Sequence, residues 1–254
     1  MDVARQNLLQ GRVSFDGHGR CEPQGVLARE QTAGRGQAGR TWHSRPKESL
    51  SATYYFQYGL AAPHAAGQIA LLAGVAVAGV LEGWIGQEPG RPCLGLKWPN
   101  DVLLNDRKVA GILIEMLSIP DQFWTALIGA GVNLAVRAFP PEIAGQATSL
   151  LLEGIAPPPW QRLGQEVADA LSLHADLQAR EGFGAILDRW RRYDRTQGLR
   201  FEAQREGAVV RGIAEDIEDS GALRLRLEDG SALVVLAASS LRTLPAQEQS
   251  APSW

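Results

Sequence analysis

Lysine is rare in this chain, and two of the three lysines occur where a charged side chain could take part in chemistry. The sequence has 25 basic residues, and all but Lys47, Lys97 and Lys108 are arginines. Lys97 lies in one predicted strand, and Lys108 opens a neighbouring one. The compact ammonium of lysine suits a site that binds an anion and then releases it. We therefore interpret Lys97 and Lys108 as candidate anion-binding residues rather than as edge lysines whose stems lie on apolar surface.

A glycine- and arginine-rich segment, residues 30–42 with the sequence EQTAGRGQAGRTW, is a second candidate. Its glycines let the backbone fold closely around a ligand, and its arginines offer planar forks for carboxylate or phosphate oxygens. Trp42 at its end is suited to stacking or to burial. The segment matches neither a P-loop nor a dinucleotide fingerprint, so composition alone slightly favours a solvated loop. The glycines and arginines concerned are Gly34, Gly36, Gly39, Arg35 and Arg40.

Two further segments place amides and a carboxylate at the ends of predicted strands. In KWPND, residues 97–101, Asn100 and Asp101 follow a strand directly. Asp101 is suited to binding Mg²⁺ or to acting as a base, and Asn100 to binding a polar ligand edge. The segment GAGVN, residues 129–133, ends a strand on Asn133. Both segments also fit a simple turn or strand-end cap, which is a common use of these residue types.

Strands between two helical regions must position these side chains. Strands are predicted where β-branched and aromatic residues are enriched or where apolar runs end at turn residues. Apolar residues at helical spacing predict a long helix over 63–84 and two helices within 160–193. Asn105-Asp106 is typical of a hairpin turn. The predicted strands cover 25–29, 50–56, 94–98, 102–104, 108–115 and 123–132, with a short helix over 2–10 and a loop over 11–23.

After Gly198 the pattern changes to short strands separated by turns, which predicts a small β-barrel-like module. The strands are expected over 199–204, 207–215, 222–228 and 231–237, with turns at 206–207, 220–221 and 229–230. The chain is therefore expected to be α+β, with a mixed sheet flanked by helices followed by the small β module. The expected divisions are a catalytic-type domain over 1–195, the β module over 196–246 and a disordered tail over 247–254.

Composition argues against several classes of protein. With 254 residues, of which 45% are hydrophobic, the chain can bury a sizeable core in one large domain with a small addition. A net charge of −3 argues against a general nucleic-acid binder. Two cysteines without a CxxC pair fit a reducing compartment and argue against a structural zinc site.

The most apolar stretch, Ile69 to Leu81, predicts a buried helix, because a membrane span needs roughly 20 residues. The N-terminus, MDVARQNLLQGR, has no apolar signal core. We therefore expect a soluble cytoplasmic protein that contacts no membrane.

Taken in order, five segments resemble the motifs of the biotin protein ligase family. Each is modest alone, whereas five in this order and spacing are specific, and the resemblance runs from about Gln24 into the C-terminal module. It implies a class II synthetase-like biotin/lipoate ligase domain, with a mixed sheet flanked by helices, followed by a small SH3-like β-barrel. The segments are EQTAGRGxxGRxW at 30–42, KWPND at 97–101, DRKVAGILIE at 106–115, GxGVN at 129–133 and ATSL at 147–150.

The resemblance also implies a two-step reaction. The biotin carboxylate attacks the α-phosphorus of ATP, with Mg²⁺ on the phosphates, and gives biotinyl-adenylate and pyrophosphate. A lysine amine on a biotin carboxyl carrier domain of a carboxylase then attacks the acyl group and releases AMP. Both reactants of the first step are anionic, so cations must gather there. The catalytic residues implied are Lys108, Arg35, Asp101 and Lys97.

Two groups of binding residues follow from the same resemblance. Those implied for biotin are Gln31, Arg35, Gly36, Gln37 and Lys108, and those for ATP are Arg40, Trp42, Lys97, Asn100 and Asn133. Asp101 is implied as a Mg²⁺ ligand, and we expect it to help deprotonate or orient the incoming lysine amine. The glycine-rich loop is expected to close as a lid that keeps water from the reactive adenylate.

Three departures from the family pattern bear on these assignments. A Ser-Thr-Asn segment and its strand, usual just before a helix like the one beginning at Asp2, are missing, which we interpret as a start assigned too late rather than as impaired biotin binding. Gln37 stands where many members have arginine, which removes one cation beside the adenylate. The C-terminal segment 236–242 lacks the usual glycine and glutamate.

Alternatives remain open beside the ligase interpretation. A degenerate, non-catalytic paralogue that binds biotin or a carrier domain is favoured by the missing strand and Gln37, and opposed by the retained Lys97, Asp101 and Lys108. A lipoate or octanoate ligase is a weaker alternative, because ligases of that kind lack the combination of GRGxxGRxW and KWPND.

The region before Gln24 is too short for the winged helix of some family members, so no DNA binding is expected. A monomer or a homodimer joined at a sheet edge fits the sequence.

Overall fold

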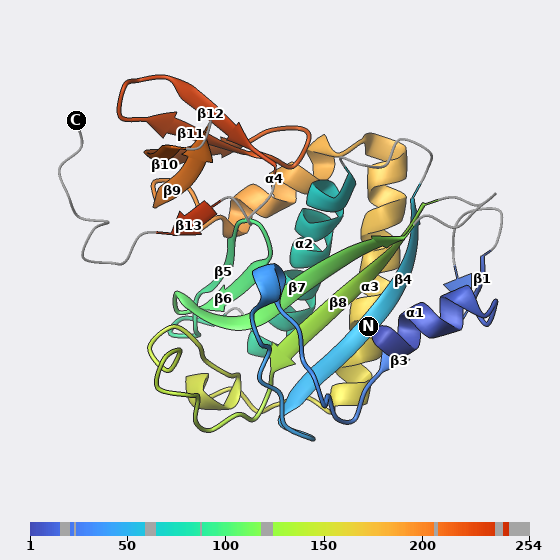
Figure 1. Cartoon of the computed structure of the whole chain (residues 1–254). Coiled ribbons are helices and arrows are strands. Elements are labelled where there is room, and N and C mark those ends of the chain that lie inside the picture. The colour runs from blue at the N-terminus through green and yellow to red at the C-terminus, as the bar shows by residue number, and fades with distance from the viewer. Residues whose placement is uncertain are drawn as a thin grey trace.

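A six-stranded sheet carries most of the segments singled out above (Figure 1). The computed structural model describes residues 1–15, 21–22, 24–58, 65–86, 88–117, 124–205, 208–236 and 241–243. The strand order is β3-β4-β8-β7-β6-β5, and each ladder is antiparallel. Two isolated parallel bridges, Leu96 with Asp194 and Lys108 with Ala147, add parallel pairing. The strands are β3 (Gly25–Leu27), β4 (Ser49–Tyr58), β5 (Leu94–Lys97), β6 (Asp101–Leu104), β7 (Arg107–Leu117) and β8 (Trp124–Asn133).

The predicted strands of this sheet are confirmed, with small shifts at their ends. The hairpin turn predicted between β6 and β7 is present, and Asn105 and Asp106 there have φ values of 48° and 59°. Two consecutive left-handed residues are what the favoured two-residue hairpin turn requires, and asparagine and aspartate tolerate that conformation. This turn brings the segment that holds Asp101 back beside the segment that holds Lys108.

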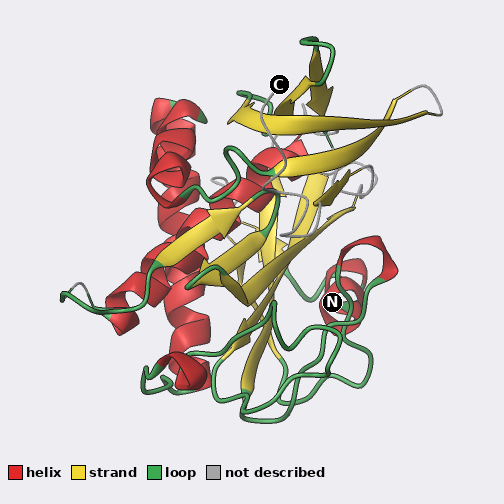
Figure 2. Ribbon diagram, turned by 90° about the vertical axis from the view of Figure 1, so that its left-hand side faces the viewer, coloured by secondary structure: helices red, strands yellow, loops and turns green. Residues whose placement is uncertain are grey.

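Three helices cover one face of the sheet (Figures 1 and 2). They are α2 (Ala65–Ile85), α3 (Trp160–Glu181) and α4 (Gly184–Tyr193). The predictions of one long helix and of two helices within 160–193 are confirmed, although the expected start of the first, at Pro63, lies outside the described residues. In α3 the apolar residues Leu163, Val167, Leu171 and Leu177, which recur at helical spacing, are all buried, as an amphipathic helix on a sheet requires.

The long helix α2 is apolar around most of its surface because it lies in the centre of the molecule. By length and composition alone, residues 66–85 are apolar enough to cross a membrane, and they are the one such segment in the described part of the chain. Most of this helix is buried, between the sheet on one side and α3 and α4 on the other. The prediction of a buried core helix is therefore confirmed.

The opposite face of the sheet carries the N-terminal helix and several loops (Figure 2). The expected short helix is confirmed as α1 (Asp2–Leu9), which buries Ala4 and Leu8. The expected loop over 11–23 is wrong in part, because β1 (Ser14–Phe15) pairs there with β2 (Cys21–Glu22). Strands of two residues are too short to leave a periodic pattern in a sequence.

The C-terminal module is a five-stranded antiparallel sheet with the order β12-β11-β10-β9-β13. The prediction of a small β unit is confirmed, but in the described residues β12 and β13 lie at the two edges and no closed barrel forms. Strand β13 lies in a segment where we predicted no strand, and the predicted turn at 206–207 and most of the segment 236–242 lie outside the described residues. The strands are β9 (Arg200–Arg205), β10 (Ala208–Ile217), β11 (Leu223–Leu227), β12 (Ala232–Val235) and β13 (Leu241–Thr243).

The small sheet and the large one share a continuous hydrophobic core. Polar contacts add to this packing at the turn between β10 and β11. The indole Nε1 of Trp98 donates a hydrogen bond to the carbonyl oxygen of Gly221 at 2.9 Å, and Nε2 of Gln68 in α2 donates to that of Asp219 at 2.7 Å. A Cβ atom on Gly221 would lie 2.8 Å from the backbone of Gly67, so the turn and the helix meet backbone to backbone.

We predict that Gly221→Ala destabilises the protein more than Gly230→Ala does. Both glycines have φ near +82°, where an L-residue costs about 1–2 kcal/mol. Space around Gly230 is open, whereas alanine at Gly221 would collide with the helix backbone and add roughly 1–3 kcal/mol of overpacking. Urea unfolding of the two variants measures the difference, and equal losses would contradict the close contact between turn and helix.

Candidate active site

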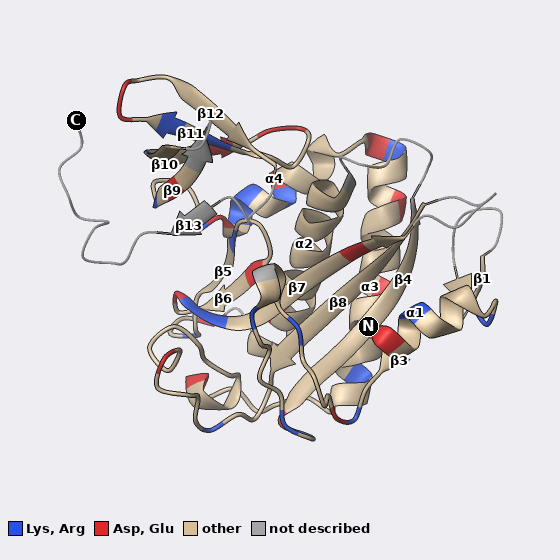
Figure 3. Ribbon diagram, viewed as in Figure 1, with Lys and Arg blue, Asp and Glu red and all other residues tan. Residues whose placement is uncertain are grey.

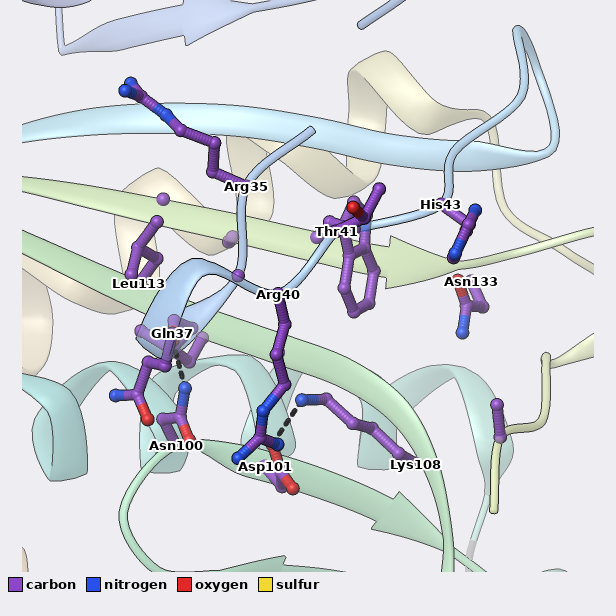
Figure 4. A pocket seen from close by; sticks show the side chains of 18 of the residues that line it. Arg35, Gln37, Arg40, Thr41, His43, Asn100, Asp101, Lys108, Leu113 and Asn133 are labelled. Carbon is purple, nitrogen blue, oxygen red and sulfur yellow. Dashed lines mark hydrogen bonds and ion pairs between the residues drawn. The ribbon is translucent and has the colours of Figure 1, made fainter. Parts of the chain in front are cut away.

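A pocket of about 570 Å³ lies against the sheet on the face that α2, α3 and α4 leave free. Strands β7 and β8 form its floor, and the loop over 31–43 and the turn between β5 and β6 form its walls (Figure 4). All of the predicted site residues line this one pocket, although they come from segments far apart in the sequence. They are Gln31, Arg35, Gly36, Gln37, Arg40, Trp42, Lys97, Asn100, Asp101, Lys108 and Asn133.

Lys108 faces the pocket because β7 contains one extra residue. Asp101 of β6 pairs with Gly111, but two residues further along β6, Leu103 pairs with Lys108, three residues away on β7. Val109 is therefore the extra residue of a β-bulge. Side chains alternate between the two faces of a regular strand, so without the bulge Lys108 and Gly111 would lie on opposite faces. Bulges commonly redirect a side chain in this way beside active sites.

A group of cations with one carboxylate among them lies at this end of the sheet. The Lys108 ammonium forms an ion pair with the Asp101 carboxylate across the β6–β7 ladder (Figure 4). Burial lowers the pKa of Lys97, Asp101 opposes that shift, and the nearby Lys108 and Arg40 lower the pKa further. Figure 4 shows the Arg40 side chain extended towards Asp101 and Lys108, and Figure 3 shows the basic stretch where β7 begins. Cations gathered in this way favour the binding of an anion.

The indole of Trp42 lies on a part of the sheet that carries no side chains. Gly111 and Gly131 are paired across β7 and β8, and a Cβ atom on Gly131 would come within 2.5 Å of the Trp42 ring. The Nζ of Lys108 is 5.8 Å from the centroid of the same ring, within the range of a cation–π contact. The two glycines thus allow Trp42 to lie flat as an apolar wall beside Lys108, a surface suited to stacking a planar ligand.

Two asparagines with predicted ligand contacts have different surroundings. The amide nitrogen of Asn133 donates a hydrogen bond to the carbonyl of Thr148 at 3.0 Å, while its Oδ1 is buried and has no partner among the described residues. The amide nitrogen of Asn100 donates to the carbonyl of Ile112 at 2.5 Å, and the backbone N–H of Ile112 donates back to Asn100. Asn133 therefore offers an acceptor to a ligand, whereas the donor of Asn100 already ties the KWPND turn to β7.

The glycine-rich segment folds into a narrow hairpin over the pocket. Arg35 and Thr41 form an antiparallel bridge, with hydrogen bonds from Gly36 to Arg40 and from Trp42 to Gly34. A Cβ atom on Gly34 would overlap the carbonyl of Trp42, so the close approach of the two arms requires glycine there. A short 3₁₀ turn, η1 (Gln37–Gly39), forms the tip and places Gln37 close to Asn100 in Figure 4.

Arg35 and Gln31 each have polar partners outside the lysine group. The guanidinium of Arg35 pairs with Asp2 at 2.6 Å and with Glu115 at 3.5 Å, and Figure 4 shows it pointing away from Lys108. The Oε1 of Gln31 accepts a hydrogen bond from Ser44 at 3.4 Å. In this conformation Arg35 does not face the same point as Lys97 and Lys108, so its predicted catalytic role stays a prediction.

The donor set fits a metal ion that is held mainly by phosphates. Mg²⁺ commonly binds through one or two carboxylates together with substrate phosphates and water. Asp101 is such a carboxylate, although it pairs with Lys108 here. Across the described ranges, no group of three histidine, cysteine, aspartate or glutamate residues could form a cage. The predicted Mg²⁺ role of Asp101 stays a prediction.

Sequence reasoning missed several parts of the wall. The segment around Phe139 and Gln146, and Phe201 from the C-terminal sheet, also line the pocket. No local pattern marks these residues, because only the fold brings them to the site. His43 is exposed and also lines the pocket, beside Asn133 in Figure 4. Its place after Trp42 was the signal that could have identified it.

Comparison with known proteins agrees with this geometry. The model of the biotin/lipoate A/B protein ligase family matches residues 18–133, and that of the biotin protein ligase C-terminal domain matches 200–246. The biotin–[acetyl-CoA-carboxylase] ligase of Mycobacterium tuberculosis is 33% identical over 85% of this chain and 77% of that protein. That of Paracoccus denitrificans is 35% identical over 79% of this chain and 83% of its own length. The chain spans 61% of the bifunctional ligase/repressor BirA of Escherichia coli, at 30% identity over 80% of this chain.

Solved structures share the fold. The biotin protein ligase from Aquifex aeolicus in complex with biotin and ATP matches with a TM-score of 0.69 and 23% identity, over 87% of this chain and 89% of that one. The biotin protein ligase from Leishmania major in complex with biotinyl-5-AMP matches with a TM-score of 0.53 and 25% identity, over 83% and 87%. Because two relatives exceed 30% identity over more than two thirds of their own length, the chain belongs to the biotin protein ligases.

Proposed function

We propose that the protein activates biotin with ATP and transfers it to a lysine of a biotin carboxyl carrier domain. An oxygen of the biotin carboxylate forms a bond to the α-phosphorus, and the bond to pyrophosphate breaks. The lysine amine of the carrier then attacks the acyl carbon, AMP leaves with the bonding electrons, and the amine gives up a proton. The observation that carries the proposal is the group of Lys97, Lys108 and Asp101 in the pocket of a chain that belongs to this family.

Charge supports the first step. A carboxylate that approaches a triphosphate is an anion that meets an anion, and fixed cations in a water-poor site reduce this repulsion strongly. We assign Lys108 to the junction of the carboxylate and the α-phosphate, because the bulge turns it into the pocket beside Trp42. We assign Lys97 and Arg40 to the phosphates. Mg²⁺, when bound with ATP, would supply further positive charge on the phosphate oxygens, with Asp101 as the available carboxylate ligand.

The remaining contacts divide the pocket into two ends. Asn133 offers an unpaired buried oxygen, which suits a ligand N–H such as the exocyclic amine of adenine. Trp42 beside it is suited to stacking the base. We place biotin towards Gln31, Gly36 and Gln37, at the hairpin end of the pocket.

For the second step we assign Asp101 to the incoming amine. Its carboxylate is partly exposed and lies between the strands that carry both lysines. Once Lys108 binds the substrate anions, Asp101 is free to accept a hydrogen bond from the lysine of the carrier. The hairpin over 35–41 would close over the adenylate and limit its hydrolysis, with Gln37 in place of a cation at the tip.

The first test is a direct assay with ATP, Mg²⁺ and labelled biotin, with and without a carrier domain. We expect release of pyrophosphate with biotin alone and label on the carrier lysine when the domain is added. A parallel reaction with lipoate should give no transfer. If neither pyrophosphate nor labelled carrier forms while biotin still binds, the protein is a non-catalytic binding paralogue and the proposal is wrong.

We predict that Lys108→Met lowers kcat/KM for adenylation by roughly 10²–10³-fold, the usual effect of removing one group that stabilises developing charge. Methionine keeps an unbranched stem that can pack against Trp42 and Gly111, so thermal unfolding should change little. The matched control is Lys47→Asn. Lys47 is exposed, lies outside the pocket and has φ of 66°, a conformation that asparagine tolerates. An equal loss in both variants, or none in Lys108→Met, would contradict the role of Lys108.

The lowered pKa of Lys97 predicts a pH effect on ATP binding. The ammonium loses its proton as pH rises through a pKa below the ordinary value of about 10.4, and the neutral amine attracts phosphate less. KM for ATP should therefore begin to rise at a lower pH than an ordinary lysine would dictate, and Lys97→Arg, which stays charged, should flatten that rise. Lys47→Arg should follow the wild type. Parallel profiles for wild type and Lys97→Arg would show that another group titrates.

A further inference from the structure

Glu153 lies outside the pocket and outside the five motifs, yet its buried side chain is the centre of a polar network. It ends the short 3₁₀ turn η3 (Leu151–Glu153), and its side chain is only 5% exposed. A buried carboxylate is costly unless it is paired and hydrogen-bonded. Its surroundings therefore indicate what it holds together.

Three donors from two segments satisfy this carboxylate. The guanidinium of Arg107 donates to its Oε1 at 2.5 Å, and the amide of Asn105 donates to its Oε2 at 2.7 Å. The hydroxyl of Thr148 also donates to Oε1, at 2.5 Å. Asn105 and Arg107 belong to the β6–β7 hairpin, whereas Thr148 lies in the segment after the pocket wall. One carboxylate thus ties the hairpin to that segment.

The backbone of Lys108, at the start of β7, forms hydrogen bonds that join the hairpin directly to the segment that holds Thr148. Its N–H donates to the carbonyl of Gln146 at 2.7 Å, and its carbonyl accepts from the N–H of Thr148 at 2.9 Å. These bonds form the isolated parallel bridge between Lys108 and Ala147. They pair the first residues of β7 on the side away from β6, directly before the bulge at Val109. If Thr148 moved away, the backbone of Lys108 would lose its hydrogen bond to Thr148 on that side of β7.

We propose that Glu153 is a positioning residue that keeps Lys108 turned into the pocket. The bulge at Val109 is one of two registers open to β7, and the regular register would turn Lys108 to the opposite face. Glu153 favours the bulged register by holding the hairpin through Arg107 and Asn105, and the paired segment through Thr148. The inference rests on the proposed function only for the chemical role of Lys108. The placement of the Lys108 side chain is a separate property, which can be measured by itself.

Because the chain has only three lysines, the environment of the Lys108 side chain can be measured directly. Reductive ¹³C-methylation labels three side chains, those of Lys47, Lys97 and Lys108, in addition to the terminal amine. In the wild type we expect the Lys108 signal to differ from that of exposed Lys47, because its ammonium lies beside Asp101 and Trp42. The variant Lys108→Arg assigns the signal by its loss.

In Glu153→Ala the Lys108 signal should lose most of the shift that Asp101 and Trp42 give it, and kcat for adenylation in the unlabelled variant should fall by about 10²-fold, the scale for misplacing a reacting group by an ångström. KM for ATP should change much less. Thr148→Val, which removes one donor at similar shape, should shift the signal and the rate in the same direction by less. If Glu153→Ala does not fold, Thr148→Val and Glu153→Gln carry the test.

The matched control is Glu166→Ala. Glu166 also ties two elements, because it accepts hydrogen bonds from Trp84 of α2 and Arg162 of α3, but it lies outside the pocket. It should leave the Lys108 signal and kcat unchanged at a comparable loss of stability. An unmoved Lys108 signal in folded Glu153 and Thr148 variants would overturn the proposal. A moved signal with an unchanged rate would support the positioning role and contradict the chemical role of Lys108.

Discussion

The rest of the site depends on one condition: several cationic side chains are held close together in a half-buried pocket, with a single carboxylate to balance their charge. Lys97, Lys108 and Arg40 lie near one carboxylate, that of Asp101, and burial together with the neighbouring cations lowers the pKa of Lys97. In water these side chains would separate, because each prefers full hydration. The fold must hold them in place before any anion arrives, and only a rigid framework can do so.

The antiparallel sheet supplies that framework at close range. Asp101 is paired with Lys97 on one side and with Gly111 on the other, so three adjacent strands fix the relative positions of the charged groups. The bulge and the glycine pair under Trp42 adapt the regular sheet to the site, one by turning a side chain and one by removing side chains altogether. The described helices on the far face contribute no residue to the pocket, but they pack against the sheet and bury that face.

Much of this was predictable from local patterns, and the remainder depended on partners far away in the chain. The strands, the turn at Asn105-Asp106 and the three helices follow from periodicity and turn chemistry, and all eleven predicted site residues line one pocket. The bulge was not predictable, because a one-residue shift has meaning only against a known neighbouring strand. The direction of Arg35 depends on Asp2 and Glu115, which no spacing connects to it. Strand β13 is too short to leave a pattern.

The near absence of lysine from the surface has a consequence for an enzyme of this kind. A mixed anhydride acylates any neutral amine that it meets, so each exposed lysine on the protein is a potential target of self-modification. Of the three lysines here, two line the pocket and are partly buried, and Lys47 is exposed. Arginine carries almost all of the remaining positive charge, and a guanidinium stays protonated and is a poor nucleophile at physiological pH. Nearly all of the protein's basic side chains are thus poor competitors with the carrier for the acyl group.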